Sequence, residues 1–166
     1  MGAPIIQHAM RQEMRLSQPR IKYQGSRTKH QTVMDGIRVA SPGEAERYLE
    51  LQIEKITGKI RDFSLQPVFE IQPAFDKVNH VTGEKIHYRK REYLGDFKVI
   101  ELDGRIRIED TKGARGFTTE IYKLKKVLVE FRYPHITIQE VRRSGREKRI
   151  DELMKKLTAL RENTGV

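Results

Sequence analysis

RIRIEDTKG, residues 105–113, alternates like a β-strand but ends with charged side chains on its apolar side. Successive side chains of a strand point to opposite faces, so Ile106 and Ile108 share one face with Asp110 and Lys112. A strand that only filled a core would continue the stripe with apolar residues. The pattern therefore predicts either a solvated strand end with a surface ion pair or a reaction centre.

The preceding run, EYLGDFKVIEL (92–102), also resembles a strand, and Asp103-Gly104 joins the two runs as a hairpin. A two-residue turn would place Asp96 and Asp110 on opposite faces. A three-residue loop over 102–104, with the glycine in the left-handed conformation, would place them opposite each other on one face. We expect the three-residue loop, because it also aligns the apolar residues of both strands.

Carboxylates on directly opposed residues repel each other, because the Cβ atoms are only roughly 4.5–5.5 Å apart. A divalent cation would neutralise the pair, and Mg²⁺ suits such hard oxygen ligands, with Mn²⁺ expected to substitute. Lys112 would then orient or deprotonate an attacking water, or stabilise charge on a phosphate. Glu109 is a rival to Asp110, but its side chain alternates to the face of Arg105 and Arg107.

The 166 residues are 37% hydrophobic and 34% charged, which is enough for one core but not for two of ordinary size. The absence of cysteine excludes disulfides, thiolate zinc sites and cysteine nucleophiles. The five histidines show no paired ligand spacing, so any metal must bind carboxylates. No apolar run could span a membrane and no secretory signal is present, so we expect a cytoplasmic protein without a membrane partner.

The net charge of +10 is concentrated at the two ends of the chain. Residues 1–40 contain seven Lys/Arg and two Asp/Glu, and residues 142–166 contain eight and four. Residues 41–141 are nearly balanced, with eighteen and seventeen. Basic ends around a neutral middle favour a polyanionic partner such as DNA, with solubility alone as the alternative.

Three segments follow from composition and periodicity. Residues 1–34 are basic and aperiodic, which predicts a flexible arm. Residues 35–141 form the expected core, and residues 142–166 hold a basic C-terminal helix at about 147–161. The core begins with SPGEAERYLELQIEKITGK (41–59), where an N-cap serine, a proline and a capping-box glutamate start a helix.

The remaining elements complete a mixed α/β layer. FSLQPVFEIQPAF (63–75) predicts an edge or bent strand because of its two prolines. TTEIYKLKKVLVEFRY (118–133) has four apolar residues at helical spacing and predicts a helix, and ITIQEV (136–141) predicts a strand after it. The expected order is helix, three strands, helix, strand, helix. No heptad or large apolar patch indicates an oligomer interface.

Three segments, in this order, resemble the PD-(D/E)XK nuclease superfamily. They are the helix with Glu44, the GDF segment around Asp96, and the EDTKG segment with Asp110 and Lys112. More narrowly, the chain resembles a phage-encoded branch of formerly unknown function. The segments that carry this resemblance are KYQGSRTKHQTVMDGI, SPGEAERYLEL, DFSLQPVFEIQP, DFKVIE, and EDTKG with the helix and strand after it. That branch is likened to Holliday junction resolvases. The resemblance covers residues 22–141.

The resemblance implies a restriction-endonuclease-like core, α-β-β-β-α-β, with a small mixed sheet flanked by helices. It implies that Asp96 and Asp110 bind Mg²⁺, that Lys112 acts on the nucleophilic water and that Glu44 completes the acidic cluster. The carbonyl of Thr111 would add a metal ligand.

One position departs from the superfamily pattern. Gly95 precedes Asp96 where the superfamily has proline, and we expect it to loosen the strand locally. If the chain is phage-encoded, its location would be the host cytoplasm.

Two basic segments are candidates for DNA contact, although a solvated helix face and protection of a strand edge are the ordinary explanations. The candidate DNA-binding residues are Arg89, Lys90, Arg91, Arg115, Tyr122, Lys123 and Lys126.

We therefore expect a Mg²⁺-dependent DNA endonuclease that hydrolyses phosphodiester bonds, acting on branched recombination or replication intermediates. A non-catalytic DNA-binding module on the same fold is the alternative, against which the intact acidic and lysine residues argue. RNA recognition lacks support, since there is no RNP-like aromatic pair or GXXG loop. Two cuts in a four-way junction favour a homodimer.

Overall fold

A four-stranded mixed sheet organises the computed structural model, which describes residues 31–32, 37–113, 116 and 118–165. The strand order is β10 (Ile138–Arg142), β9 (Ile106–Lys112), β8 (Phe97–Ile100) and β3 (Asp62–Leu65). β8 pairs antiparallel with both β3 and β9, whereas β10 is parallel to β9. A parallel neighbour requires a crossover connection, and helix α3 supplies it.

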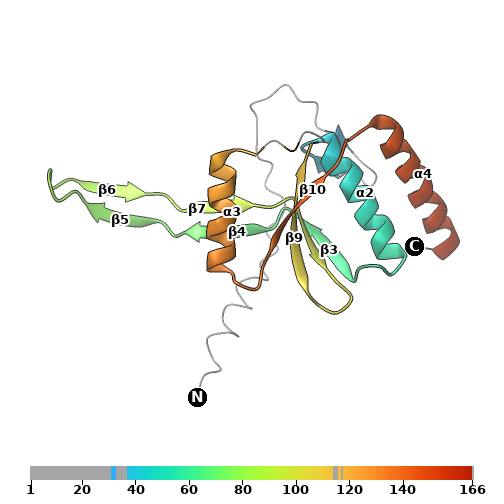
Figure 1. Ribbon diagram of the computed structural model, residues 1–166, viewed down its shortest axis with the longest axis horizontal. Coiled ribbons are helices and arrows are strands. Elements are labelled where there is room, and N and C mark those ends of the chain that lie inside the picture. The colour runs from blue at the N-terminus through green and yellow to red at the C-terminus, as the bar shows by residue number, and fades with distance from the viewer. Residues whose placement is uncertain (1–30, 33–36, 114–115, 117, 166) are drawn as a thin grey trace, which may run out of the picture.

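Helices cover both faces of this sheet (Figure 1). α2 (Pro42–Ile56) and α4 (Glu147–Thr164) share one core with Phe97 and Val99 of β8. α3 (Glu120–Arg132) packs on the other face, in a second core with Ile108 and Ile138. The chain order α2, β3, β8, β9, α3, β10 confirms the predicted α/β layer, and α4 confirms the C-terminal helix.

The hairpin between β8 and β9 adopts the three-residue register. Ile100 pairs with Ile106, and Phe97 pairs with Glu109. The N–H of Glu101 donates to the carbonyl of Arg105 at 2.9 Å, which closes the loop of residues 102–104. Gly104 has φ of +86°, the left-handed conformation that glycine adopts without steric cost. The predicted face of β9 is therefore confirmed.

The predicted strand over residues 63–75 was wrong in extent. It divides at Pro67 and Pro73, which have no N–H to donate to a neighbouring strand, into β3, β4 (Val68–Gln72) and the start of β5 (Phe75–Val78). The predicted strand over 92–102 likewise divides into β7 (Arg91–Leu94) and β8.

These divisions create a two-stranded extension, here called the ribbon, over residues 68–94. β4 pairs with β7, and β5 pairs with β6 (Lys85–Tyr88), both antiparallel. The ribbon projects away from the sheet (Figure 1). Stacked rings of Phe75 and Tyr88, with centroids 4.8 Å apart, and an ion pair between Asp76 and Lys85 hold its outer half together.

Most of the predicted arm lies outside the described residues, which begin with β1 (Gln31–Thr32). β1 pairs antiparallel with β2 (Arg38–Val39). Within the described ranges, no helix combines the length and apolar character that a membrane span requires.

Candidate functional site

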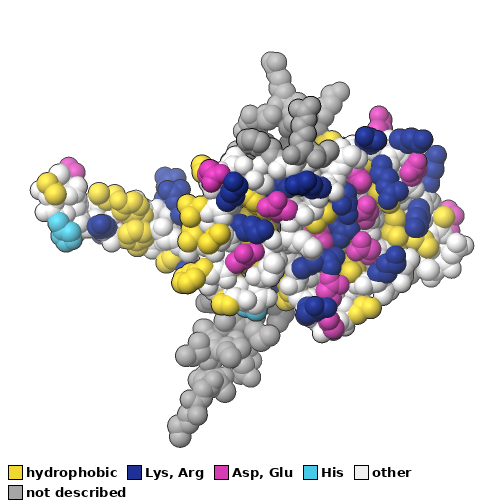
Figure 2. All heavy atoms as spheres, viewed as in Figure 1, with side chains coloured by type: hydrophobic (Ala, Val, Ile, Leu, Met, Phe, Trp, Pro, Cys, Tyr) yellow, Lys and Arg dark blue, Asp and Glu magenta, His cyan; other side chains and the backbone are white. Residues whose placement is uncertain are grey.

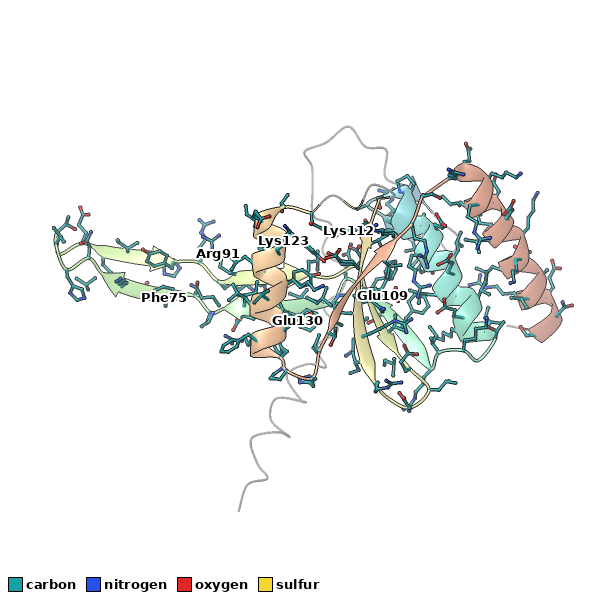
Figure 3. All side chains as sticks on the ribbon, viewed as in Figure 1. Phe75, Arg91, Glu109, Lys112, Lys123 and Glu130 are labelled. Atoms are coloured by element: carbon teal, nitrogen blue, oxygen red, sulfur yellow. The ribbon has the colours of Figure 1, made fainter. Side chains whose placement is uncertain are left out.

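The C-terminal end of β9 brings the predicted residues Asp110 and Lys112 together. Lys112 donates from Nζ to Oδ2 of Asp110 at 2.7 Å, and the same nitrogen lies 3.7 Å from the centre of the Tyr122 ring on α3. Asp110 is 7% exposed. Figure 3 shows Lys112 between α3 and the start of α2. The ammonium group is thus held between a carboxylate and an aromatic face. Lys112 and Asp110 share one face of the strand, as alternation predicted.

Asp96 lies where the ribbon rejoins the sheet, and backbone hydrogen bonds fix it there. Its N–H donates to the carbonyl of Glu109 at 3.0 Å, and its carbonyl accepts from the N–H of Gln66 at 2.9 Å. Its side-chain Oδ2 accepts from the N–H of Thr111 at 2.6 Å. Gln66 has φ of 50°, a left-handed conformation that is unfavourable for a residue other than glycine. The structure therefore holds Asp96 beside β9 at the cost of local backbone strain.

Gly95 does not loosen the strand as expected. Its N–H donates to the carbonyl of Pro67 at 3.0 Å, and a Cβ atom built on it would lie 2.8 Å from the Ile108 side chain. A proline here would lose the hydrogen bond and collide with Ile108. Packing against Ile108 therefore accounts for the glycine at this position.

Glu44 starts α2 with a reciprocal capping box. Its N–H donates to Oγ of Ser41 at 3.2 Å, while its carboxylate accepts from that hydroxyl at 3.0 Å and from the N–H of Ala40 at 3.1 Å. Burial raises the pKa of Glu44, the hydrogen bonds from Ala40 and Ser41 oppose the shift, and the negative charge of Asp110 adds to it. Glu44 thus both caps α2 and lies within electrostatic reach of the strand carboxylates.

Three carboxylates at this end of the sheet lack sufficient positive charge. Burial, followed by the charges of Glu44 and Asp110, raises the pKa of Asp96 to about 8. The N–H of Thr111 and the charge of Lys112 lower that pKa but do not cancel the increase. A divalent cation would relieve the repulsion, and carboxylates are the donors that Mg²⁺ prefers. Among the described side chains, no three acidic or histidine groups already form a closed set of metal ligands.

Two buried phenol hydroxyls beside this cluster, those of Tyr93 and Tyr122, make no hydrogen bond of ordinary geometry among the described residues, although Asp110 acts on both. Burial and the nearby charge of Asp110 raise the pKa of both tyrosines, so the phenols stay neutral. Buried polar groups normally have partners, and unpaired ones need an explanation such as a bound ligand, ion or water. These hydroxyls mark the cluster as a place where polar atoms can be added.

Sequence reasoning missed Glu140. In the parallel register, Glu140 of β10 is the partner of Asp110 of β9, and it lies 3.8 Å from Nζ of Lys126. Its negative charge also raises the pKa of Tyr122, after burial and Asp110. Alternation in ITIQEV places Glu140 on the face of Ile136 and Ile138, but only the pairing of β10 with β9 brings it to the site.

Glu109, the rival to Asp110, faces the opposite side of the sheet. It is 1% exposed and accepts from Nε of Arg47 at 2.6 Å and from Nε of Arg107 at 2.8 Å. Burial alone would raise the pKa of Glu109, but the two guanidinium groups hold it below its ordinary range. Its alternation was predicted correctly, and its partners make it part of an ion-pair network.

The candidate DNA-binding residues lie in two places. Arg89, Lys90 and Arg91 lie where β6 and β7 meet, and Figure 3 shows Arg91 projecting from the ribbon beside α3. Lys123 and Lys126 lie on α3, paired with Glu120 at 2.7 Å and with Glu140 at 3.8 Å. The ring of Tyr122 contacts the ammonium group of Lys112, and Arg115 lies outside the described residues. DNA contact by these residues remains a prediction.

Comparison with known proteins gives one family. No curated protein and no solved structure matches the chain. A family model described as "Protein of unknown function (DUF1064)" matches residues 20–149, which include α2, the ribbon, the whole sheet and α3. The chain therefore belongs to the DUF1064 family.

Proposed function

We propose that the protein is a Mg²⁺-dependent DNA endonuclease with a restriction-endonuclease-like core, which cuts branched DNA such as the junctions formed in phage recombination or replication. The observation that carries this proposal is the cluster of Glu44, Asp96 and Asp110 beside Lys112. Burial, together with the charges of Glu44 and Asp110, raises the pKa of Asp96 in this cluster to about 8. Buried groups with strongly shifted pKa values are concentrated at functional sites.

The donors at this place fit a magnesium ion. Asp96 and Asp110, with Glu44 and the carbonyl of Thr111, would hold it through hard oxygen atoms. Bound Mg²⁺ would polarise a phosphate and lower the pKa of a coordinated water. The unpaired hydroxyls of Tyr93 and Tyr122 could hydrogen-bond to water or phosphate oxygens at the same place.

Lys112 is the residue of this chain that would act on the reacting groups. Its Nζ is fixed by Asp110 and by the Tyr122 ring, so the ammonium group stays next to the carboxylates. From there it would orient an attacking water or stabilise the negative charge that grows on the phosphate. Preorganised charge of this kind lowers the barrier, because it need not rearrange during the reaction.

Positive side chains around the cluster would hold the DNA backbone. Arg89 and Arg91 are exposed midway along the ribbon, and Lys123 is exposed near the start of α3. Together with the basic ends of the chain, they would supply phosphate contacts that do not depend on DNA sequence.

A non-catalytic DNA-binding module is the second candidate. One observation favours it, since both carboxylate oxygens of Glu44 are already used in the capping box. In that case the acidic cluster would only shape the fold, and the protein would bind DNA without cutting it.

Cleavage assays separate the two candidates. Purified protein is incubated with labelled linear, flap, fork and four-way DNA in Mg²⁺, in Mn²⁺ and in EDTA. We expect metal-dependent cuts, strongest on the branched substrates. Asp103→Asn is a matched control, because Asp103 is an exposed carboxylate on the same hairpin that pairs with Arg105. Binding without cutting in both metals would establish the module instead.

A further inference from the structure

The outward side of α3 carries a continuous apolar stripe, here called the α3 stripe. Its members are Ile121, Leu124, Val127, Leu128 and Phe131. Phe131 is 83% exposed and Ile121 is 70% exposed. Figure 2 shows hydrophobic side chains gathered at the position of α3. Exposure of this patch was not expected from the sequence.

The stripe is not needed to hold α3 on the sheet, because a different side of the helix does this. Val129 is fully buried, and Tyr122 and Tyr133 pack against the same core. Tyr133 also donates from its hydroxyl to the carbonyl of Glu70 in the ribbon at 3.2 Å. The helix thus has a packed face and a second, exposed apolar face. Contiguous exposed patches of this kind mark interaction sites.

The spacing of the stripe suits packing against another helix. Ile121, Leu124, Leu128 and Phe131 follow one another at intervals of three, four and three residues. This is the repeat of the apolar seam in two-helix packing, where each side chain fits between side chains of the partner helix. A seam of this kind is complementary to a second copy of itself.

We propose that the α3 stripe is a two-fold interface between two copies of this chain. In a two-fold dimer, the same patch of both subunits meets, so it must not repel itself. Charges of both signs lie on α3, where Glu120 and Glu130 accompany four basic residues, Lys123, Lys125, Lys126 and Arg132. Ion pairs already join Lys123 to Glu120, Lys126 to Glu140 and Arg132 to Glu70, which limits the repulsion between two copies. The five residues of the stripe are themselves all apolar, so the stripe offers no cation to a nucleic acid.

A dimer formed through this interface would contain two copies of the candidate site, one in each subunit. Tyr122, which follows Ile121 directly, carries Lys112 on its ring, so each α3 joins the interface to a site. If the proposed nuclease function holds, each subunit of the dimer would cut one strand. The interface itself does not depend on that function, and it can be tested without DNA.

The first test measures the mass of the full chain in solution by light scattering on a sizing column, over a range of concentrations. We expect a dimer for the parent protein and a monomer for Leu124→Glu with Leu128→Glu, with the dimer dissociation constant raised at least about 100-fold. Leu102→Glu is the control, since Leu102 is 65% exposed at the hairpin turn, far from α3 in sequence. Unchanged circular dichroism would show that the variants fold.

The second test uses the absence of cysteine in the chain. Leu124→Cys with Leu128→Cys should give a covalent dimer on oxidation, whether the two helices run parallel or antiparallel. Leu102→Cys should not. A monomeric parent with no cross-link would overturn the proposal, as would a dimer that the glutamate substitutions leave intact.

Discussion

Two neighbouring residues of β9, Glu109 and Asp110, are both buried, yet their surroundings are opposite. Glu109 faces α2 and is matched by Arg47 and Arg107, which hold its pKa low. Asp110 faces α3 and shares its side of the strand with Asp96, whose pKa is raised to about 8. On the Glu109 face, guanidinium groups of the protein balance the carboxylate. On the Asp110 face, the carboxylates outnumber the positive groups beside them.

Under the proposed function, the difference separates a structural carboxylate from those that would bind the metal ion. A buried ion pair with full hydrogen bonding is complete, and nothing further has to bind there. Crowded carboxylates with one lysine beside them lower the free energy of unfolding. Such an arrangement is typical of sites where a bound ligand offsets the repulsion. The sharpest experiments therefore change one face at a time.

The largest effect is expected for Asp110→Asn. The amide keeps the shape of the side chain but removes the charge that a divalent ion needs, so cleavage should fall below detection. Folding stability should change by less than about 1 kcal/mol, because lost repulsion offsets the lost contact with Lys112. Cleavage rates and thermal unfolding of the same preparation check both statements. Parent-like cleavage would remove Asp110 from the site.

Lys112→Ala should slow cleavage by on the order of 10² to 10⁴ while leaving the carboxylates in place. Mg²⁺ should still bind, which titration calorimetry can measure. Lys98→Ala is a suitable control, since Lys98 is a half-buried lysine on the adjacent strand β8. Equal losses in both variants would point to a general charge effect.

Glu109→Gln tests the balanced face. It leaves the guanidinium group of Arg47 without its closest partner, although Glu54 still accepts from that group at 2.8 Å. We expect a loss of on the order of 3 kcal/mol in the free energy of unfolding, measured in urea. The folded fraction should cut DNA at nearly the parent rate. A catalytic defect larger than the folding defect would contradict the division between the faces.

The smallest effect is a pH dependence that differs between the faces. Because the folded pKa of Asp96 is raised to about 8, its contribution to stability is fully present below its unfolded pKa and is lost as pH rises through about 8. The metal-free protein should therefore melt at lower temperature at about pH 9 than at about pH 6. Added Mg²⁺ should restore more stability at the higher pH.

Asp96→Asn should reduce both the pH effect and the response to Mg²⁺. The lowered pKa of Glu109 gives the opposite sign, since its stabilisation is lost only as pH falls through its folded value. A melting temperature that does not respond to Mg²⁺ at any pH would show that no ion binds the cluster.

Local signals predicted the elements that position Asp110 and Lys112. The capping box of α2 and the alternation of β9 depend on neighbouring residues, so the sequence contains them directly. The choice of hairpin register followed from the apolar pattern and from the glycine at position 104.

Long-range pairing could not be predicted in the same way. Glu140 meets Asp110 only because β10 lies parallel to β9 after a helical crossover. Arg47 finds Glu109 across 62 residues of chain. On α3, two apolar faces are present, and helical periodicity alone does not say which one the sheet covers. The prolines at positions 67 and 73 indicated interruptions, but the path of the ribbon depends on pairing between β5 and β6.

The ribbon joins the sheet beside Asp96, so a force on its outer strands would act on this connection. The chain enters it through Gln66 and Pro67 and leaves it through Gly95 and Asp96, and two backbone hydrogen bonds tie these peptides together, from Gln66 to Asp96 and from Gly95 to Pro67. Helix α3 also holds the inner strands, because Arg132 and Tyr133 donate to Ile71 and Glu70 of β4. A partner that binds the outer half of the ribbon would therefore act both on α3 and on the peptide that carries the Asp96 carboxylate.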